Sequence, residues 1–241
     1  MIRCFLGYDE REAVAMHVCA SSILRRASKP VSFTFLANNQ LIDDYVETHV
    51  EGSGLIKAGY QPSNAFIYSR FLVPWLCGFD GWALFLDGDM IVKADIADLW
   101  RRRDPNRAVQ VVQHDYRTKH ATKYFGQPNQ DYPRKMWSSV VLCNCWHPRN
   151  RRLYPEFVMQ AAGSYLHRFE WLDDEQIGAL PLEWNWLVSE YEPSSEAKLL
   201  HYTIGGPYLP EYAECDHSDD WGSEFAAMLT PFSEFANAEQ K

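Results

Sequence analysis

Trp82-Ala83-Leu84-Phe85-Leu86-Asp87-Gly88-Asp89-Met90-Ile91-Val92 is the stretch of sequence that decides the fold. Its first five residues are apolar and have the length and composition of a buried β-strand. Asp87 and Asp89 follow the strand, and buried carboxylates are strongly disfavoured unless something positive binds them. Gly88 permits a turn that aims both side chains at one point. The stretch therefore predicts a site for Mg²⁺ or Mn²⁺, although a polar β-turn also explains these residues.

The residues before this stretch predict a mainly parallel sheet flanked by helices. Residues 2–6 and 31–36 are rich in apolar and β-branched side chains, and residues 9–27 between them have helical periodicity. A strand-helix-strand unit of this kind favours parallel pairing. A second helix, roughly residues 63–76, leads into the strand that ends at Leu86. Because open α/β sheets bind ligands at the carboxyl ends of their strands, the two carboxylates lie where a ligand is expected.

The second half of the chain is less regular. Three strands and one helix are predicted, at residues 108–113, 138–143 and 198–202 and at residues 153–162. A polar segment from Asp115 to Lys135 is predicted to be a long loop, and loops of this length are usually functional or mobile. Asn38-Asn39 is predicted to form a turn, and the tail from about Ser233 is expected to fray.

Length and composition limit the possible classes of protein. The 241 residues fit one α/β domain. The formal net charge of -9 does not favour binding of nucleic acid over a broad surface. No secretory signal and no apolar run of about 20 residues is visible, so we expect a cytoplasmic protein with its six cysteines reduced. Peripheral contact with a membrane and the oligomeric state stay open.

The segment from Lys198 to Pro207 is a second candidate for the site. His201 follows an apolar strand and offers a third metal ligand, one that suits Mn²⁺ better than Mg²⁺. Gly205 and Gly206 would let the backbone approach a phosphate. A core histidine before a Gly-Pro turn is the structural alternative, and it is the commoner explanation for an isolated histidine.

Four ordered segments between Ile2 and Pro207 resemble glycosyltransferase family 8, the group that contains glycogenin and bacterial lipopolysaccharide glycosyltransferases. The resemblance implies the GT-A fold for nucleotide-diphospho-sugars, as one catalytic domain over residues 1–241. About residues 1–113 would form the nucleotide-binding half, and about residues 114–241 the half for donor sugar and acceptor. The implied reaction is metal-dependent transfer of a hexose from a nucleotide-diphosphate sugar, expected to be a UDP-sugar, to an acceptor hydroxyl on a carbohydrate, with retained configuration.

The first two segments concern the nucleotide. By resemblance, Gly7-Tyr8-Asp9 at the end of the first strand contacts the base and ribose, although capping of the following helix explains Asp9 equally well. Arg70, in Tyr68-Ser69-Arg70-Phe71, would reach the donor phosphate or sugar, for which a guanidinium is well suited. A surface salt bridge is the alternative for Arg70.

The other two segments concern the metal and the donor sugar. The resemblance assigns Asp87, Asp89 and His201 as ligands of Mn²⁺ or Mg²⁺, with Gly88 at the turn. It also places Asp174 at the donor-sugar hydroxyls, with Glu175 standing where the family usually has glutamine. Exposed acidic residues at a helix start are the alternative for this pair. The Leu180-Pro181-Leu182-Glu183-Trp184-Asn185 segment that follows also matches the family.

The chain departs from the family at two places. The family motif His-x-x-Gly-x-x-Lys-Pro is altered, because Gly205 stands four positions after His201 and no lysine precedes Pro207. The diphosphate therefore lacks an expected cation. The candidate replacements are the amides of Gly205 and Gly206 and the side chains of Lys198 and Arg70.

The family's Asn-Ala/Ser-Gly stretch is also missing. Trp137-Ser138-Ser139-Val140-Val141-Leu142 stands in its place, and Ser138 and Ser139 are candidates for lining the donor-sugar pocket. Without the asparagine and glycine, the identity of the sugar stays open.

Three other functions remain as alternatives. The tryptophan-rich composition and the missing lysine are compatible with a catalytically silent sugar-binding protein. A haloacid-dehalogenase-like phosphatase would use Asp87 as nucleophile, but Ile91 occupies a position where that class needs Thr or Val. A zinc module is suggested by Cys143-x-Cys145-x-His147 and Cys215-x-His217, whose spacings miss the usual pattern.

Overall fold

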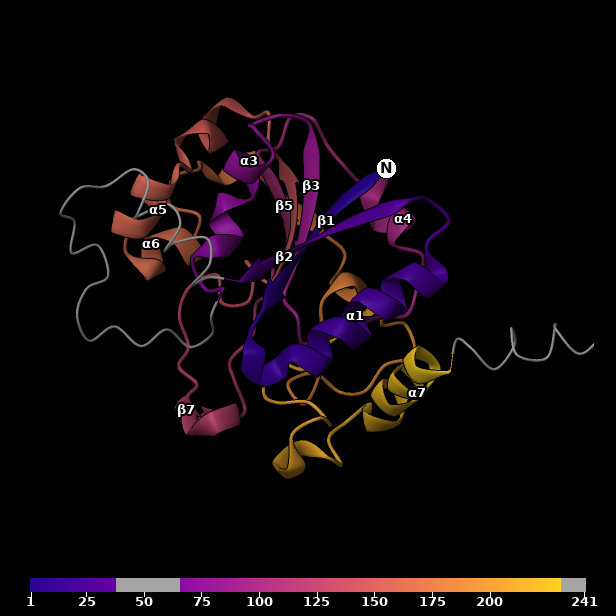
Figure 1. Cartoon of the computed structure of the whole chain (residues 1–241). Helices are drawn as coiled ribbons and strands as arrows, with labels where there is room; N and C mark the ends of the chain where they lie inside the picture. The colour runs from indigo at the N-terminus through magenta and orange to yellow at the C-terminus, as the bar shows by residue number, and fades with distance from the viewer. Residues whose placement is uncertain (38–65, 231–241) are drawn as a thin grey trace, which may run out of the picture.

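A computed structural model describes residues 1–37 and 66–230. The central sheet has six strands: β1 (Ile2–Tyr8), β2 (Val31–Ala37), β3 (Trp82–Leu86), β5 (Val109–Val112), β8 (Val140–Asn144) and β9 (Ile177–Leu180). Their order is β2-β1-β3-β8-β5-β9 (Figure 1). β1 is parallel to β2 and β3, and β5 is parallel to β9, whereas β8 is antiparallel to both neighbours. The mixed, mainly parallel sheet expected from the sequence is confirmed.

A second sheet has three short strands, β4 (Met90–Val92), β10 (Trp186–Leu187) and β11 (Leu199–His201). Its order is β10-β11-β4, and β11 is antiparallel to β4 with His201 opposite Met90. Because β4 follows β3 after a three-residue turn, Asp87-Gly88-Asp89 joins the two sheets. This connection places the predicted metal site at their junction.

Helices cover both faces of the central sheet. The helices are α1 (Ala13–Arg26), α3 (Val73–Leu76), α4 (Ile96–Trp100), α5 (Pro155–Gln160), α6 (Gly163–His167) and α7 (Ser218–Leu229). Figure 1 shows α1 running across the sheet with α7 beside it, and α5 and α6 on the other side. Short 3-10 helices occur at Glu10–Glu12, Ser69–Leu72, Tyr124–Gly126, Pro148–Arg152, Asp174–Gln176, Leu182–Trp184 and Pro210–Tyr212.

The β3 strand explains why both faces are covered. Successive side chains of a strand point to opposite faces, so Leu84 and Leu86 pack with Met16 of α1. Ala83 and Phe85 point the other way and pack in a cluster with side chains of α3, α5 and α6. Apolar residues at every position therefore suit a strand buried on both sides.

Several predicted elements differ in extent from the observed ones. The predicted helix 63–76 is not continuous in its described part. A turn at residues 66–68 leads into the 3-10 helix Ser69–Leu72 and then into α3, which has Pro74 in its first turn. The predicted loop 115–135 contains a hairpin of β6 (Thr122–Lys123) and β7 (Gln127–Pro128). The predicted helix 153–162 is shorter, because it is confined to α5.

Two of the predictions concern residues that the structure does not describe. The predicted turn at Asn38-Asn39 and the tail from Ser233 lie outside the described residues. Within residues 1–37 and 66–230, no helix combines the length and apolarity needed to cross a bilayer.

Candidate metal and ligand site

Asp87, Asp89 and His201 converge at the junction of the two sheets. One ligand atom from each residue lies within 4.8 Å of the others. Nε2 of His201 is 3.3 Å from Oδ1 of Asp89 and 3.9 Å from Oδ2 of Asp87. In the described part of the chain, this is the only group of three or more His, Cys, Asp or Glu residues close enough to share an ion. The structure thus brings the three predicted ligands together.

Backbone contacts fix the turn that carries the two carboxylates. The amide of Asp87 donates to the carbonyl of Ser139 over 3.0 Å, and the amide of Tyr202 donates to the carbonyl of Asp89 over 3.0 Å. A Cβ atom on Gly88 would lie 2.4 Å from the carbonyl oxygen of Gly7. The glycine is therefore needed for the close approach of this turn to the end of β1.

Arg70 is buried beside Asp87. Its Nη1 lies 2.8 Å from Oδ1 of Asp87 and also donates to the carbonyl of Ser138 over 3.0 Å. The guanidinium carbon is 5.1 Å from the ring centroids of both Phe66 and Phe85. The alternative of an exposed salt bridge is therefore wrong, because Arg70 is 7 % exposed.

His201 is oriented by a chain of hydrogen bonds. The hydroxyl of Ser139 donates to the carbonyl of Met136 and accepts from Nδ2 of Asn185 over 2.8 Å. Oδ1 of Asn185 then lies 3.0 Å from Nδ1 of His201 and accepts its proton. Nε2 is consequently the ring nitrogen that faces the carboxylates, which is the arrangement that a metal-binding imidazole needs. Asn185 belongs to the Leu180–Asn185 segment that matches the family, but the resemblance implied no role for it.

The electrostatics of the cluster fit a cation. Burial raises the pKa of Asp87 to about 6, although Arg70 opposes that rise. Burial would also raise the pKa of Asp89, but the nearby His201 outweighs it and the pKa is lowered. Oδ1 of Asp89 is buried and makes no well-aligned hydrogen bond. Two carboxylates and one imidazole suit a hard divalent ion, and such an ion would satisfy the buried Asp89 oxygen.

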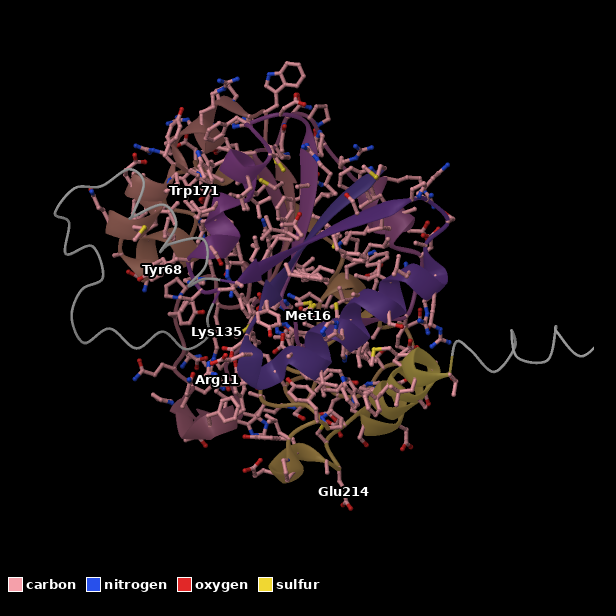
Figure 2. The ribbon with its side chains drawn as sticks, viewed as in Figure 1. Arg11, Met16, Tyr68, Lys135, Trp171 and Glu214 are labelled. Carbon is pink, nitrogen blue, oxygen red and sulfur yellow. The ribbon has the colours of Figure 1, made fainter. Side chains whose placement is uncertain are left out.

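A pocket of about 680 Å³ opens onto this cluster. Its size lies within the range of small-molecule sites in proteins. Six predicted residues line it: Arg70, Asp87, Asp89, Ser138, Ser139 and His201. Arg11 and Lys135, labelled in Figure 2, come from different segments and line it as well.

Lys123 and His167 are among the lining residues that the sequence analysis did not predict. Burial lowers the pKa of His167 to about 3, and its Nδ1 lies 2.7 Å from the hydroxyl oxygen of Ser138. No periodic pattern marks either residue. The length of the loop that contains Lys123 was the one signal available.

Asp174 and Glu175 lie away from the pocket. They precede β9, whose first residue, Ile177, pairs with Val109 at the start of β5. The metal cluster lies at the opposite end of the sheet, after β3. Asp174 is exposed and pairs with Arg134. The structure therefore does not bring this predicted pair to the site, because the chain runs directly from it into β9.

The predicted nucleotide-binding residues of the first turn also do not line the pocket. Oδ1 of Asp9 accepts from the amide and Nε of Arg11, and Oδ2 accepts from Nη2 over 2.6 Å. Asp9 therefore serves the start of the helical segment, which is the alternative that the sequence left open. Tyr8 is half-buried and packs against the core, and a Cβ atom on Gly7 would lie 2.4 Å from the Phe66 ring.

Of the candidate replacements for the missing cation, Arg70 lines the pocket, whereas Gly205, Gly206 and Lys198 do not. A Cβ atom on Gly205 would meet the Tyr212 ring at 2.4 Å, and one on Gly206 would meet the Tyr208 ring at 2.4 Å. Both glycines thus accommodate aromatic neighbours, and neither lines the pocket. Nζ of Lys198 lies 3.5 Å from a carboxylate oxygen of Glu183, outside the pocket.

Comparisons with known proteins agree with this architecture. No family model matches the chain. Protein CDI of Arabidopsis thaliana is 42% identical over 227 residues, which cover 92% of this chain and 85% of that protein. The galactosyltransferase LgtC, solved with donor and acceptor sugar analogues, superposes with a TM-score of 0.60 at 14% identity over 98% of this chain and 99% of LgtC.

The bifunctional glycosyltransferase WbbM superposes with a TM-score of 0.57 at 18% identity over 97% of this chain. This chain spans 50% of the length of WbbM. These structural likenesses confirm the expected GT-A fold. The sequence match, in turn, shows that the chain belongs to the family of Protein CDI.

Proposed function

We propose that the protein is a metal-dependent glycosyltransferase that moves a hexose from a nucleotide-diphosphate sugar, a UDP-sugar, to a hydroxyl of a carbohydrate acceptor with retained configuration. The observation that carries the proposal is the convergence of Asp87, Asp89 and an oriented His201 on one pocket. The fold shared with LgtC supports it, since that structure holds donor and acceptor sugar analogues.

The pocket residues can be given roles on this basis. A divalent ion held by Asp87, Asp89 and His201 would neutralise charge on the diphosphate leaving group. Arg70 keeps Asp87 oriented and places a guanidinium at the pocket wall. Among the described residues, the two aspartates are the only carboxylates that line the pocket. The described residues therefore offer no separate carboxylate nucleophile there. On this proposal, the leaving phosphate itself would accept the proton of the acceptor hydroxyl.

The proposal predicts that UDP-sugar binding requires Mn²⁺ and Asp89. In calorimetric titrations, Asp89→Ala should weaken UDP-glucose or UDP-galactose binding by about 100-fold or more, because loss of a ligand should exceed the 10- to 100-fold typical of outer-shell changes. Asp174→Asn is the matched control, since Asp174 is exposed outside the pocket. Binding that survives both a chelator and the Asp89 change would disprove the proposal.

A nucleotide-sugar-binding protein without turnover is the second candidate. The observation in its favour is that Asp174 and Glu175 lie outside the pocket. Mn²⁺-dependent binding of UDP-sugars without release of UDP across a panel of sugar acceptors would select this candidate. Release of UDP that depends on an acceptor would select the transferase. The structural comparisons give the phosphatase alternative no support, because the fold is GT-A.

A further inference from the structure

Lys123 is a cation that lines the pocket and forms no ion pair with another described residue. Burial lowers the pKa of Lys123, while the charges of Asp89 and Asp87 oppose that effect. In the part of the chain that the structure describes, its Nζ makes no hydrogen bond and no ion pair. Nζ lies 5.3 Å from the centroid of the Tyr124 ring. The ammonium therefore faces the pocket with its hydrogen-bonding capacity available.

The other pocket cations are already engaged. Arg70 is shared between Asp87 and a carbonyl, and Arg11 binds the Asp9 carboxylate. Nζ of Lys135 donates to Oδ1 of Asn129 over 2.8 Å. Among the described residues that line the pocket, Lys123 is thus the cation that can accept an anionic ligand without breaking an existing contact.

The fold brings Lys123 close to the turn at Gly205-Gly206-Pro207. Glycosyltransferase family 8 has a lysine in this turn, and this chain lacks it. Lys123 ends β6, and the amide of the next residue, Tyr124, donates to the carbonyl of Ile204 over 2.8 Å. Ile204 immediately precedes Gly205-Gly206-Pro207. A hairpin from the 115–135 segment therefore supplies a lysine beside the altered motif, although the two segments are distant in sequence.

The hairpin is anchored, so the position of Lys123 is defined. The amide of Asn129 donates to the carbonyl of Ala121 over 2.9 Å, at the base of the hairpin. The buried carboxylate of Glu190 accepts from the hydroxyl of Thr118 and from the amide of Lys119 over 2.8 Å. These contacts fix the strand that carries Lys123 before any ligand binds.

The charges of the site match a diphosphate. Two of the described cations that line the pocket are paired with aspartates outside it, Arg11 with Asp9 and Lys135 with Asp131. Of the other charged lining residues, Asp87 and Asp89 contribute two negative charges and Arg70 and Lys123 two positive ones, so these four side chains sum to zero. The neighbouring Glu12 adds no charge at neutral pH, because burial raises its pKa to about 8. A divalent ion would then leave two positive charges for the roughly two negative charges of a diphosphate ester.

We propose that the Lys123 ammonium binds the diphosphate of the donor and replaces the lysine that is absent before Pro207. This inference rests on the proposed function. In the transfer, the bond between the anomeric carbon and the diphosphate oxygen breaks, and its electron pair stays on that oxygen. Lys123 stabilises this charge, while the acceptor oxygen bonds to the anomeric carbon and passes its proton to the leaving diphosphate.

The test compares UDP binding by Lys123→Gln and by wild-type protein in the presence of Mn²⁺, with calorimetry as the readout. UDP affinity should fall by about 10- to 100-fold, the range for a hydrogen bond to a charged group. Mn²⁺ affinity should not fall, because loss of a positive charge near Asp87 and Asp89 favours a cation there, and the melting temperature should stay unchanged. Lys123→Arg should keep most of the UDP affinity, and Lys198→Gln, outside the pocket, should keep all of it.

The alternative outcomes separate this inference from the proposed function. Wild-type UDP affinity in Lys123→Gln would overturn the role of Lys123 alone. An equal fall in Mn²⁺ and UDP affinity would also overturn it, because the lysine would then act through the metal site. Wild-type protein that binds Mn²⁺ but no UDP would refute the proposed function, and this inference with it.

Discussion

His201 presents Nε2 to Asp89 because Asn185 occupies its other ring nitrogen, and Ser139 in turn orients the Asn185 amide. At the residue scale, the site thus depends on side chains outside the Asp-Gly-Asp motif. Gly88 has a comparable supporting role. It carries no functional group, but its lack of a side chain lets the carboxylate turn pack against Gly7.

Replacing Gly88 by alanine should destabilise the protein. The new Cβ atom would lie 2.4 Å from the Gly7 carbonyl oxygen, a backbone atom that cannot move aside like a flexible side chain. We expect urea unfolding to show a loss of about 1 to 3 kcal/mol in the free energy of unfolding, the usual cost of overpacking.

Gly222→Ala is the matched control for that experiment. Gly222 lies within α7, and a Cβ atom there would meet nothing within 4 Å. Alanine is a better helix former than glycine, so this variant should gain about 0.4 to 1 kcal/mol. Equal stability of Gly88→Ala and wild-type protein would contradict the proposed steric role.

At the scale of elements, the start of α1 is joined to the C-terminal segment. The hydroxyl of Tyr208 donates to Oε1 of Glu12 over 2.6 Å, and Tyr208 also packs near Trp221 of α7. Burial, together with the charge of Asp89, raises the pKa of Glu12 to about 8. The folded protein therefore favours the protonated form of a residue that is ionised at neutral pH when unfolded.

This raised pKa predicts a pH dependence of stability. The raised pKa of Glu12 adds to the free energy of unfolding, in full when the pH is below the ordinary pKa of 4.5. This contribution is lost as the pH rises through about 8. Glu12→Gln keeps an acceptor for Tyr208 but cannot ionise. In urea unfolding at pH 8, the variant should be at least about 1 kcal/mol more stable than wild-type protein, with little difference at pH 5. The same difference at both pH values would show that Glu12 does not titrate in this range.

At the scale of the whole molecule, the pocket lies where separate parts of the fold meet. The turn between β3 and β4, the end of β11, the β6-β7 hairpin and α6 all contribute to it. The carboxylates are tied through backbone bonds to Ser139 and Tyr202, so the two sheets share the site. A ligand in the pocket would therefore contact several segments at once.

Ligand binding should protect these segments together. In hydrogen-exchange measurements with UDP and Mn²⁺, residues 87–92, 122–128 and 199–204 should exchange more slowly, because binding to the native state suppresses opening. The α4 helix, whose residues do not line the pocket, serves as an internal reference. Protection confined to one segment would argue against a shared site.

The sequence by itself predicted five of the six strands of the central sheet, the helix α1 and the paired carboxylates, whereas β9 and α7 were not predicted. Apolar residues at every position of β3, a polar turn after it and the helical periodicity of α1 are local patterns. Backbone geometry converts such patterns into structure with little influence from distant residues, because side-chain direction repeats every two or 3.6 residues. Asp87 and Asp89 could be paired in this way because they are neighbours in the chain.

Only the tertiary structure decided which distant side chains meet. It placed Asn185 behind His201 and Lys123 beside the altered glycine turn, and it left Asp174 at the far end of the sheet. The meeting of His201 with the carboxylates was implied by the family resemblance and not by any local pattern. The physical reason is that these placements depend on strand order, register and the packing of a loop. Such features are fixed by contacts between remote segments, and no local periodicity encodes them.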